Sequence, residues 1–344
     1  MVPQNQEIAM ADPSTVEKGG AGFEGIKLLL CENPLPPIDE AIEAAENALP
    51  HSNYYTEPYS EPLRTLLSEE LDVPEANLHI NAGSELILRQ LFDRFGQHVH
   101  LLTPTYPLFP EIAQEYTETR LRPENEFEID LVSLDIPPET TLAVIVNPNN
   151  PNGGTFDMTP LPDLLEEHPE TKFLVDEAFI DLAGESVVSL VPEFDNLLVS
   201  RTLSKAHSLA GFRIGYAVLP ESIASDLNTS NDAYPLARPS QAAAIATLEH
   251  EATIQERVDE LRSWTTQLAA DLEALDVRTF PTETYFFLAD FSPHSATDIA
   301  AQFRERDILV KPLNNSRLGP GYMRLTTARP EDNEQVVAAL SEIL

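Results

Sequence analysis

Short apolar runs alternate with segments of helical periodicity through the middle of the chain. Strands that alternate with helices require crossover connections, which place helices on both faces of a mainly parallel sheet. The pattern therefore predicts an α/β fold with a central sheet sandwiched by helices. The predicted strands cover residues 99–102, 142–146, 173–175 and 197–199, and the predicted helices cover residues 84–95, 107–116 and 161–168.

The pattern changes in the last third of the chain. Residues 241–275 are rich in Ala, Glu and Leu, and this predicts one long helix. After it the strands are short and separated by single helices, which is typical of a smaller α+β unit. The predicted strands there are 284–288 and 323–327, and the predicted helices are 295–304 and 330–344.

A chain of 344 residues is long enough for about two domains. We expect a large α/β domain at about 46–243. A smaller α+β domain would combine residues 26–45 with residues 244–344. The polar, glycine-containing segment 1–25 would form a mobile lead-in.

Acidic residues outnumber basic ones along the whole chain. Fifty-seven acids face twenty-one bases, which gives a formal net charge of −36. Such a field repels nucleic acid and anionic membranes, so we expect neither as a partner. One interpretation is a protein that binds cations or basic partners. The other is a solvated surface suited to high salt and a halophilic source, which the even spread of the acids favours.

Targeting, redox and metal signals are few. No apolar run approaches the ~20 residues that span a bilayer, and residues 1–25 have neither the basic nor the apolar region of a signal peptide. The single cysteine, Cys31, excludes an internal disulfide framework. The eight histidines include no pair four residues apart, so we expect no metal site. These features together predict a cytoplasmic protein.

A lysine among hydroxyl residues follows the predicted strand at 197–199. Lys205 is one of five lysines in the chain, and Arg213 follows it eight positions later. A lysine amine can form an imine with an aldehyde, and hydroxyl groups with a guanidinium can hold a phosphate. The alternative is an ordinary surface lysine on a loop.

Three further segments lie at the end of a predicted strand or at the start of a predicted helix. Open α/β sheets bind their ligands at the carboxyl ends of the strands. The turn at 147–154 is either a plain turn or a rigid mount for an Asn side chain. Asp176 is either a helix N-cap or a partner for a cationic ring nitrogen. The turn at 81–86 opens a helix whose free amides suit a phosphate, unless Ser84 simply caps that helix.

The order of these four segments resembles the fold-type I pyridoxal 5'-phosphate (PLP) enzymes, and specifically the class I and II aminotransferases. The resemblance covers about residues 26–344, and the histidinol-phosphate aminotransferase branch is the most similar. It implies a PLP-transferase-like large domain beside a smaller α+β domain. The stretches that carry it are Glu32-Asn33-Pro34, Asn147-Pro148-Asn149-Asn150-Pro151, Asp176-Glu177-Ala178 and Arg201-Thr202-Leu203-Ser204-Lys205-Ala206.

The resemblance implies roles for four residues around the cofactor ring. Lys205 would hold PLP as a Schiff base and, once substrate displaces it, would act as the base that moves a proton from Cα. Asp176 would pair with the pyridine nitrogen and keep it protonated. Asn150 would donate a hydrogen bond to the ring 3-oxygen. Tyr106 would stack on the face of the ring.

A second group of residues would surround the phosphate of the cofactor. Tyr55 matches a tyrosine that reaches the phosphate of the neighbouring subunit, which implies a homodimer with shared active sites. The other phosphate ligands implied by the resemblance are Ala82, Gly83, Ser84, Thr202, Ser204 and Arg213.

The substrate side departs from the branch in several places. Arg324 matches the arginine that grips a substrate carboxylate or phosphate. Lys311 stands where the branch has an arginine, and it keeps the charge but loses the bidentate geometry. Phe179 replaces a tyrosine, as in the related threonine-phosphate decarboxylases. Leu29, Cys31 and Tyr285 replace asparagines, so the lining is more apolar.

The resemblance predicts a ping-pong aminotransferase that acts on amino acid and 2-oxo acid substrates. Histidinol phosphate is the leading amino donor, an aromatic or aliphatic amino acid is the alternative, and 2-oxoglutarate is the default acceptor. A PLP-dependent decarboxylase is the second hypothesis, favoured by Phe179. A non-enzymatic effector-binding protein is a third, opposed by the short segment before residue 26 and by the acidic charge.

Overall fold

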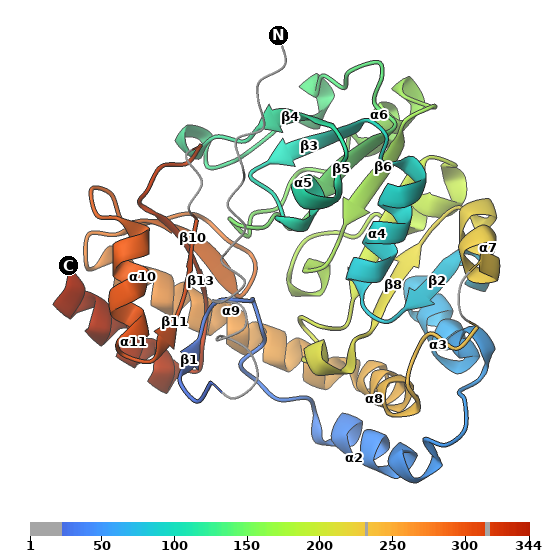
Figure 1. Ribbon diagram of the computed structural model, residues 1–344, viewed down its shortest axis with the longest axis horizontal. Helices are drawn as coiled ribbons and strands as arrows, with labels where there is room; N and C mark the ends of the chain where they lie inside the picture. The colour runs from blue at the N-terminus through green and yellow to red at the C-terminus, as the bar shows by residue number, and fades with distance from the viewer. Residues whose placement is uncertain (1–22, 231–232, 314–316) are drawn as a thin grey trace.

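The computed structural model describes residues 23–230, 233–313 and 317–344. These residues form a seven-stranded sheet, a four-stranded sheet and a two-stranded pair (Figure 1). The segment expected to be a mobile lead-in, 1–25, lies outside the described residues except for its last three. None of the helices in the described ranges is long and apolar enough to cross a membrane.

The seven-stranded sheet is the frame of the larger part of the molecule. Its strand order is β2-β8-β7-β6-β5-β3-β4, and β8 alone runs antiparallel to its neighbours. The carboxyl ends of the six parallel strands therefore lie at one edge. The strands are β2 (Leu78–Asn81), β3 (Val99–Thr103), β4 (Tyr116–Arg120), β5 (Leu142–Val146), β6 (Lys172–Asp176), β7 (Leu197–Thr202) and β8 (Gly215–Val218).

Helices cover both faces of this sheet, as β5 shows. Leu142, Val144 and Val146 pack in a cluster with residues of α4 and α7, whereas Ala143 and Ile145 pack in a second cluster with residues of α2, α6 and α8. Alternate residues thus enter opposite layers, which confirms the predicted sandwich. The helices are α2 (Asp39–Ala48), α3 (Glu61–Leu71), α4 (Ser84–Phe95), α5 (Leu108–Ile112), α6 (Leu161–Glu167), α7 (Glu221–Ser230) and α8 (Arg238–Leu248).

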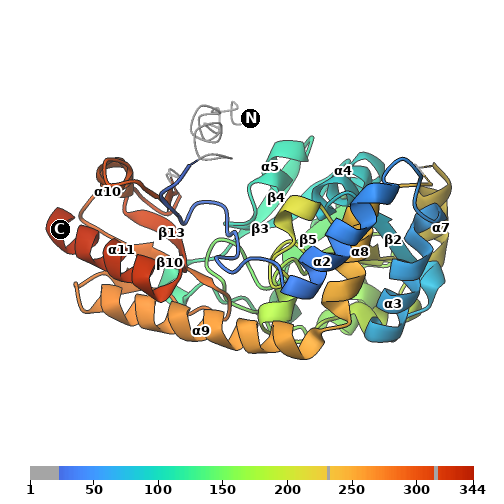
Figure 2. The same ribbon diagram turned by 90° about the horizontal axis from the view of Figure 1, so that it is seen from below.

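The four-stranded sheet belongs to the smaller part of the molecule. Its order is β12-β13-β10-β9, all antiparallel, and α9, α10 and α11 pack on it around a separate apolar cluster. Helix α9 runs along both parts (Figure 2). The elements are β9 (Arg278–Thr279), β10 (Phe286–Asp290), β12 (Lys311–Pro312), β13 (Tyr322–Thr326), α9 (Glu251–Glu273), α10 (Ala296–Arg304) and α11 (Pro330–Ile343).

The N-terminal segment joins this smaller part. Strand β1 (Ile26–Lys27) pairs in parallel with β11 (Ile308–Leu309), and Leu28 packs in the small apolar cluster. This pairing places only the start of the segment 26–45 beside the C-terminal part, because Ile38 and the α2 residues Ala41 and Ala45 pack in the apolar cluster of the large sheet. The domain boundaries themselves stay a prediction.

Several predicted elements differ from the structure. The helix expected at 107–116 ends at Ile112, and Tyr116 starts the edge strand β4, whose sequence Tyr-Thr-Glu-Thr-Arg has no apolar run. The single helix expected at 241–275 is two helices, because His250 leaves the helical conformation with φ −119° and ψ 39°. The strand expected at 284–288 is Phe286–Asp290, because Thr284 forms a side-chain turn with Thr282. None of these shifts moves a predicted site residue away from its strand end.

Candidate functional site

The carboxyl edge of the large sheet gathers most of the predicted site residues. Gly83 follows β2, Tyr106 follows β3, and Asn150 follows β5. Asp176 ends β6, and Lys205 lies in the turn after β7. Parallel strands bring their following loops to one edge, so residues scattered over more than a hundred positions meet at one place.

Lys205 lies partly buried in that turn and points toward the N-terminal segment. Its Nζ donates to the main-chain oxygens of Cys31 (3.0 Å) and Leu30 (3.3 Å) and lies 5.3 Å from the ring centroid of Phe179. Burial lowers the pKa of the Lys205 amine, and the nearby guanidinium of Arg324 lowers it further. A lowered pKa increases the fraction of neutral amine, which is the form that acts as nucleophile and base.

Asp176 is buried at the end of β6. Burial raises the pKa of its carboxyl to about 6, although a hydrogen bond from Ser200 Oγ at 2.7 Å opposes the rise. Ser200 reaches it because β6 and β7 pair in the register that places Asp176 beside Ser200. The short helical turn that follows has Phe179 as its N-cap, so Asp176 does not cap it. A buried acid of this kind fits a cationic partner.

The turn before α4 and the guanidinium of Arg213 form a tight cradle. Gly83 has φ +89°, and a Cβ added there would lie 2.5 Å from Arg213 Nη2. A Cβ on Gly215 would lie 2.0 Å from the Ser84 amide, so both glycines are needed for this close approach. Gly83 is the N-cap of α4 and no side chain caps the helix, which rules out the simple capping interpretation of Ser84.

The hydroxyl pair expected at the same phosphate site lies across this cradle. Thr202 Oγ1 and Ser204 Oγ are 2.9 Å apart, and the Ser204 amide donates to Thr202 Oγ1 at 3.1 Å. The Ala82 amide is different, because it donates to Asn81 Oδ1 at 2.8 Å within its own turn. Ala82 therefore contributes no free amide here, whereas Gly83, Ser84, Thr202, Ser204 and Arg213 surround one small region.

Arg324 extends the site toward the small sheet. Its Nη1 donates to Asn150 Oδ1 at 2.8 Å, and its Nη2 donates to the Leu29 oxygen at 2.6 Å. The buried Nε has no hydrogen-bond partner in the part of the chain that the structure describes. Lys311 is the register neighbour of Arg324 on β12, and burial together with Arg324 lowers the pKa of the Lys311 amine. A buried arginine with a half-buried lysine beside it favours an anionic ligand.

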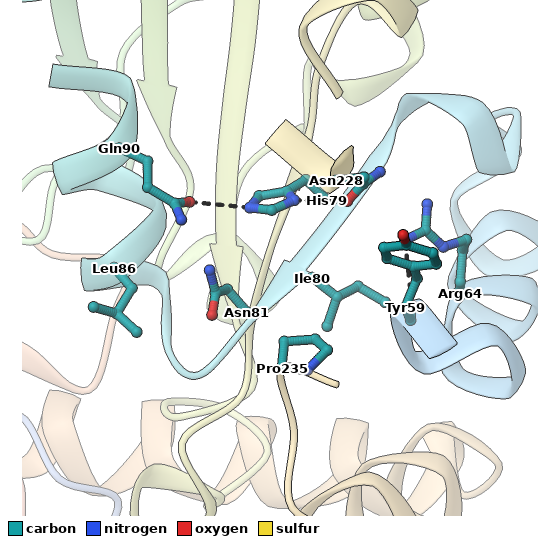
Figure 3. Close-up of a pocket in the computed structure, with 9 residues that line it drawn as sticks. All are labelled: Tyr59, Arg64, His79, Ile80, Asn81, Leu86, Gln90, Asn228 and Pro235. Atoms are coloured by element: carbon teal, nitrogen blue, oxygen red, sulfur yellow. Dashed lines mark hydrogen bonds between the residues drawn. The ribbon is translucent and has the colours of Figure 1, made fainter. Parts of the chain in front are cut away.

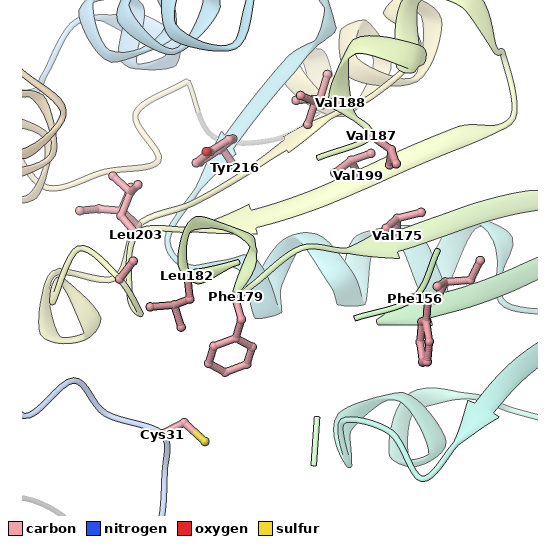
Figure 4. Packing of buried hydrophobic residues seen from close by; sticks show 14 of the residues in the cluster. Cys31, Phe156, Val175, Phe179, Leu182, Val187, Val188, Val199, Leu203 and Tyr216 are labelled. Carbon is pink, nitrogen blue, oxygen red and sulfur yellow. The ribbon is translucent and has the colours of Figure 1, made fainter. Parts of the chain in front are cut away.

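Residues 28–33, which we call the strap, close the site on the N-terminal side. The Cys31 oxygen accepts a hydrogen bond from the Tyr285 hydroxyl at 2.8 Å, and the Leu28 oxygen accepts one from Thr326 at 3.2 Å. Figure 4 shows Cys31 on the strap, across from Phe179. The strap binds its neighbours largely through main-chain oxygens, which carry no sequence signal, and this explains why its role could not be read from residue types.

The two predicted tyrosines differ in their surroundings. Tyr106 packs edge-on against Phe109, and burial with the charges of Glu85 and Asp176 raises its pKa to about 12. Tyr106 is thus an uncharged ring at the site edge. Tyr55 is 76% exposed, and its ring stacks on Tyr234 at 4.5 Å between centroids. Its described contacts do not bring it to the site of its own chain.

A cavity of about 200 Å³ lies beside β2 and α4 (Figure 3). His79 bonds to Asn228 Oδ1 at 2.8 Å and to Gln90 Oε1 at 3.0 Å, and Arg64 donates to the Leu78 oxygen at 2.8 Å. These polar groups hold one another, so the cavity presents little free recognition chemistry. Its lining is completed by Tyr59, Ile80, Asn81, Leu86 and Pro235.

The histidines do not assemble a metal site in the described ranges, where no group of three or more metal-binding side chains occurs. A pair spaced by one residue, His98 and His100, does exist in the sequence. His100 is buried between Thr117 Oγ1 (2.8 Å) and Thr119 Oγ1 (3.0 Å), whereas His98 is exposed near Glu115. The two histidines therefore lie at the edge of the large sheet, where His100 bonds to side chains of β4.

The chain is similar to known proteins over nearly its whole length. The family model described as aminotransferase class I and II matches residues 26–340. A histidinol-phosphate aminotransferase of Acinetobacter baumannii is 30% identical over 329 residues, covering 92% of this chain and 90% of the relative.

Two solved structures share the fold. The histidinol-phosphate aminotransferase of Sinorhizobium meliloti, in complex with pyridoxal-5'-phosphate, has a TM-score of 0.87 at 21% identity and covers 100% of this chain and 97% of its own. The L-threonine-O-3-phosphate decarboxylase of Porphyromonas gingivalis has a TM-score of 0.82 at 22% identity, covering 92% and 99%.

Proposed function

The chain belongs to the class I and II aminotransferases, and from that membership we propose that it moves the amino group of histidinol phosphate to 2-oxoglutarate. It is a PLP-dependent aminotransferase. The observation that carries the proposal is the meeting of Lys205, Asp176 and the Arg324–Asn150 pair at one edge of the large sheet. When bound, PLP withdraws electrons from the bonds of the substrate carbon that carries the amine.

The residues present fit this cofactor. Gly83 leaves room beside the Arg213 guanidinium, and Gly215 leaves room beside the Ser84 amide, and a Cβ on either residue would fill that room. Thr202 and Ser204 add hydroxyl groups to the same cradle. A phosphate suits such a combination of helix N-terminus, hydroxyl and guanidinium. The buried Asp176 carboxyl, with its raised pKa, suits a protonated pyridine nitrogen.

Lys205 is the residue we assign to covalent attachment and to proton transfer. Its amine lies in reach of the strap and beside Phe179, and burial lowers its pKa toward the range in which it exchanges protons. Once freed, the amine would take the proton from the substrate carbon and hold it at Nζ until it is returned. Tyr106 would cover the ring of the cofactor, and Asn150 would donate to its 3-oxygen.

Arg324 and Lys311 are the residues we assign to the anionic end of the substrate. In a transamination the donor leaves before the acceptor enters, so one set of cations must accept both a phosphate ester and a carboxylate. A buried arginine fork suits either group, and Lys311 adds a second charge for the phosphate. The name of the Acinetobacter baumannii relative supports histidinol phosphate as donor. An aromatic or aliphatic amino acid is the alternative donor.

We also propose that the enzyme is a homodimer with shared sites. Tyr54, Tyr55 and Tyr59 lie on one segment and are 67%, 76% and 39% exposed. Clustered exposed aromatics are typical of a protein interface. Tyr55, which does not reach its own site, would then reach the phosphate in the partner subunit.

A decarboxylase remains the second candidate, and Phe179 is the observation that favours it. Its ring packs edge-on against Phe286 at 4.8 Å and Tyr285 at 6.0 Å between centroids, so it is held by the core rather than by a polar partner. The likeness to the Porphyromonas gingivalis decarboxylase is one of fold.

Absorption and a substrate panel test the proposal. Purified protein with PLP should show a visible band that borohydride abolishes, and Lys205→Ala should lack the band and lose about 10²–10⁴-fold in rate. Histidinol phosphate with 2-oxoglutarate should yield glutamate. An unchanged band in Lys205→Ala would contradict the assigned attachment. Glutamate formation from phenylalanine but not from histidinol phosphate would contradict the donor, and CO₂ release without glutamate would support the decarboxylase.

A further inference from the structure

Asn33, in the Glu32-Asn33-Pro34 stretch, has no part in the function proposed so far, yet its side chain is fully engaged. Its Nδ2 donates to the main-chain oxygens of Lys205 and Ala206, both at 3.1 Å. Its Oδ1 accepts from the Leu35 amide at 2.9 Å. The amide group therefore links the strap to the residue that carries the chemistry, although the two are 172 positions apart in sequence.

Apart from the burial of Leu203, Ala206 and Leu209 in the apolar cluster, the main chain at Lys205 has few other described hydrogen bonds. It lies in an irregular turn between β7 and β8, outside any regular helix or strand. Within this turn, the Ser208 amide donates to the Lys205 oxygen at 3.1 Å, and the Leu209 amide donates to the Leu203 oxygen at 3.1 Å. These are local bonds, so they shape the turn but do not fix it against the rest of the site.

The other end of the strap is fixed to the small sheet. Arg324 and Thr326 of β13 donate to its Leu29 and Leu28 oxygens, and Tyr285 donates to its Cys31 oxygen. A series of hydrogen bonds therefore connects Arg324, through the strap and Asn33, to the turn that holds Lys205.

We propose that Asn33 is a positioning residue that holds the Lys205 turn in register with the Arg324 side of the site. This inference rests on the proposed role of Lys205 as the amine that attaches the cofactor and moves the proton. Proton transfer of this kind depends on placement, because an error of about 1 Å in a reacting group costs about 10²-fold in rate.

Asn33→Asp is the sharpest variant, because it keeps the shape of the side chain and the acceptor for Leu35 but replaces both donors with an acceptor. The introduced carboxylate would face two carbonyl oxygens and release the turn. Asn196→Asp is the matched control. Asn196 Nδ2 also donates to main-chain oxygens, those of Leu165 (3.0 Å), His168 (3.2 Å) and Thr171 (3.3 Å), at the opposite end of the sheet.

Amide hydrogen exchange is the first measurement, and it needs no turnover. In purified Asn33→Asp protein, peptides that cover residues 203–210 should exchange faster than in the wild type, whereas Asn196→Asp should leave them unchanged. In the PLP-loaded proteins, the pH titration of the visible band should shift in Asn33→Asp only. The kcat should fall at least tenfold in that variant, with KM changed less than threefold, because binding groups stay in place.

The defect in Asn33→Asp should shrink as the pH falls. Two facing carbonyls raise the pKa of the introduced carboxyl, and its protonated form can again donate one hydrogen bond. The ratio of variant to wild-type kcat should therefore rise toward acid pH. A merely structural lesion would not be repaired by a proton.

Three outcomes would overturn the inference. One is unchanged exchange of residues 203–210 in Asn33→Asp, another is a wild-type band titration in that variant, and a third is equal losses in Asn33→Asp and Asn196→Asp. A wild-type protein without any visible band would instead refute the proposed function. Faster exchange of residues 203–210 would in that case still support the role of Asn33 in holding the Lys205 turn.

Discussion

The two sides of the site are built in different ways. The side that we assign to the cofactor consists mainly of residues that follow parallel strands of the large sheet within a few positions of the strand end, and Arg213 lies just before the antiparallel β8. The substrate side joins Arg324 on an antiparallel strand to the strap, whose Leu29 oxygen comes from 295 positions earlier. One side is positioned by the sheet itself, and the other by hydrogen bonds between distant segments.

Their charges differ as well. On the cofactor side, burial raises the pKa of the Asp176 carboxyl, so that position suits a cation. On the substrate side, burial lowers the pKa of Lys311, beside Arg324, so that position suits an anion. The comparison teaches that these two positions suit ligands of opposite charge, and that the two halves meet at the hydrogen bond from Arg324 to Asn150.

Asp176→Asn should give the largest effect, and it tests the cofactor side. Removing the charge that we assign to the ring nitrogen should lower kcat by about 10²–10³-fold, as for other preorganised electrostatic groups. Substrate KM should change little, because Arg324 is untouched. Asp157→Asn is the control, since Asp157 is an exposed acid whose described hydrogen bonds come from Thr159.

The same variant should stabilise the folded protein, although it lowers activity. The carboxyl pKa is about 6 in the folded chain against an ordinary value of 3.8, so the folded state binds the proton more tightly than the unfolded state. The stabilisation is complete below about pH 4 and is lost as the pH rises through 6, a difference of about 3 kcal/mol. Cofactor-free Asp176→Asn should therefore melt higher than the wild type at pH 7–8. A lower melting temperature would contradict the raised pKa of the buried Asp176 carboxyl.

Arg324→Lys should give the next largest effect, and it tests the substrate side. Lysine keeps the charge but loses the fork that reaches Asn150 and the strap. We expect kcat/KM to fall about 30-fold, the loss typical of a charged hydrogen bond. The visible band of the cofactor should be retained but should shift, because Asn150 loses its bond from Arg324. Arg306→Lys, on an arginine outside the site, should change neither. An unshifted band in Arg324→Lys would show that the two sides are independent.

The cofactor side could be predicted from the sequence because its signals are local. Lys205, Asp176 and Asn150 each follow or end a buried apolar run. Because the strands formed by these runs are parallel, their carboxyl ends lie at one edge of the sheet. Even there, one assignment was wrong in detail. The Ala82 amide bonds to Asn81 rather than facing the phosphate cradle, because the Asn side chain competes for it locally.

The substrate side could be predicted only in part. Arg324 and Lys311 were found by resemblance, but their connection to the strap runs through main-chain oxygens that no residue type reveals. Ser200 had no predicted role, whereas strand register places it beside Asp176. The break at His250 and the edge strand β4 were missed because neither carries a strong periodic signal. Pairing between distant segments, rather than local preference, decided these features.

Lys311→Met should have the smallest effect, and it tests the contribution of Lys311 separately from that of Arg324. The register neighbour of Arg324 would lose its charge while the arginine stays, so the preference for a phosphorylated over an unphosphorylated donor should fall about tenfold, close to the worth of one charged contact. Lys172→Met is the control, because Lys172 lies at the far end of β6 and bonds to the Asp195 oxygen at 3.0 Å. Burial lowers the pKa of Lys311, so the wild-type preference should also decline toward alkaline pH and the variant should show no such decline. Equal losses for both donors would mean that Lys311 supports Arg324 rather than the phosphate, and the substrate side would then be a single arginine site.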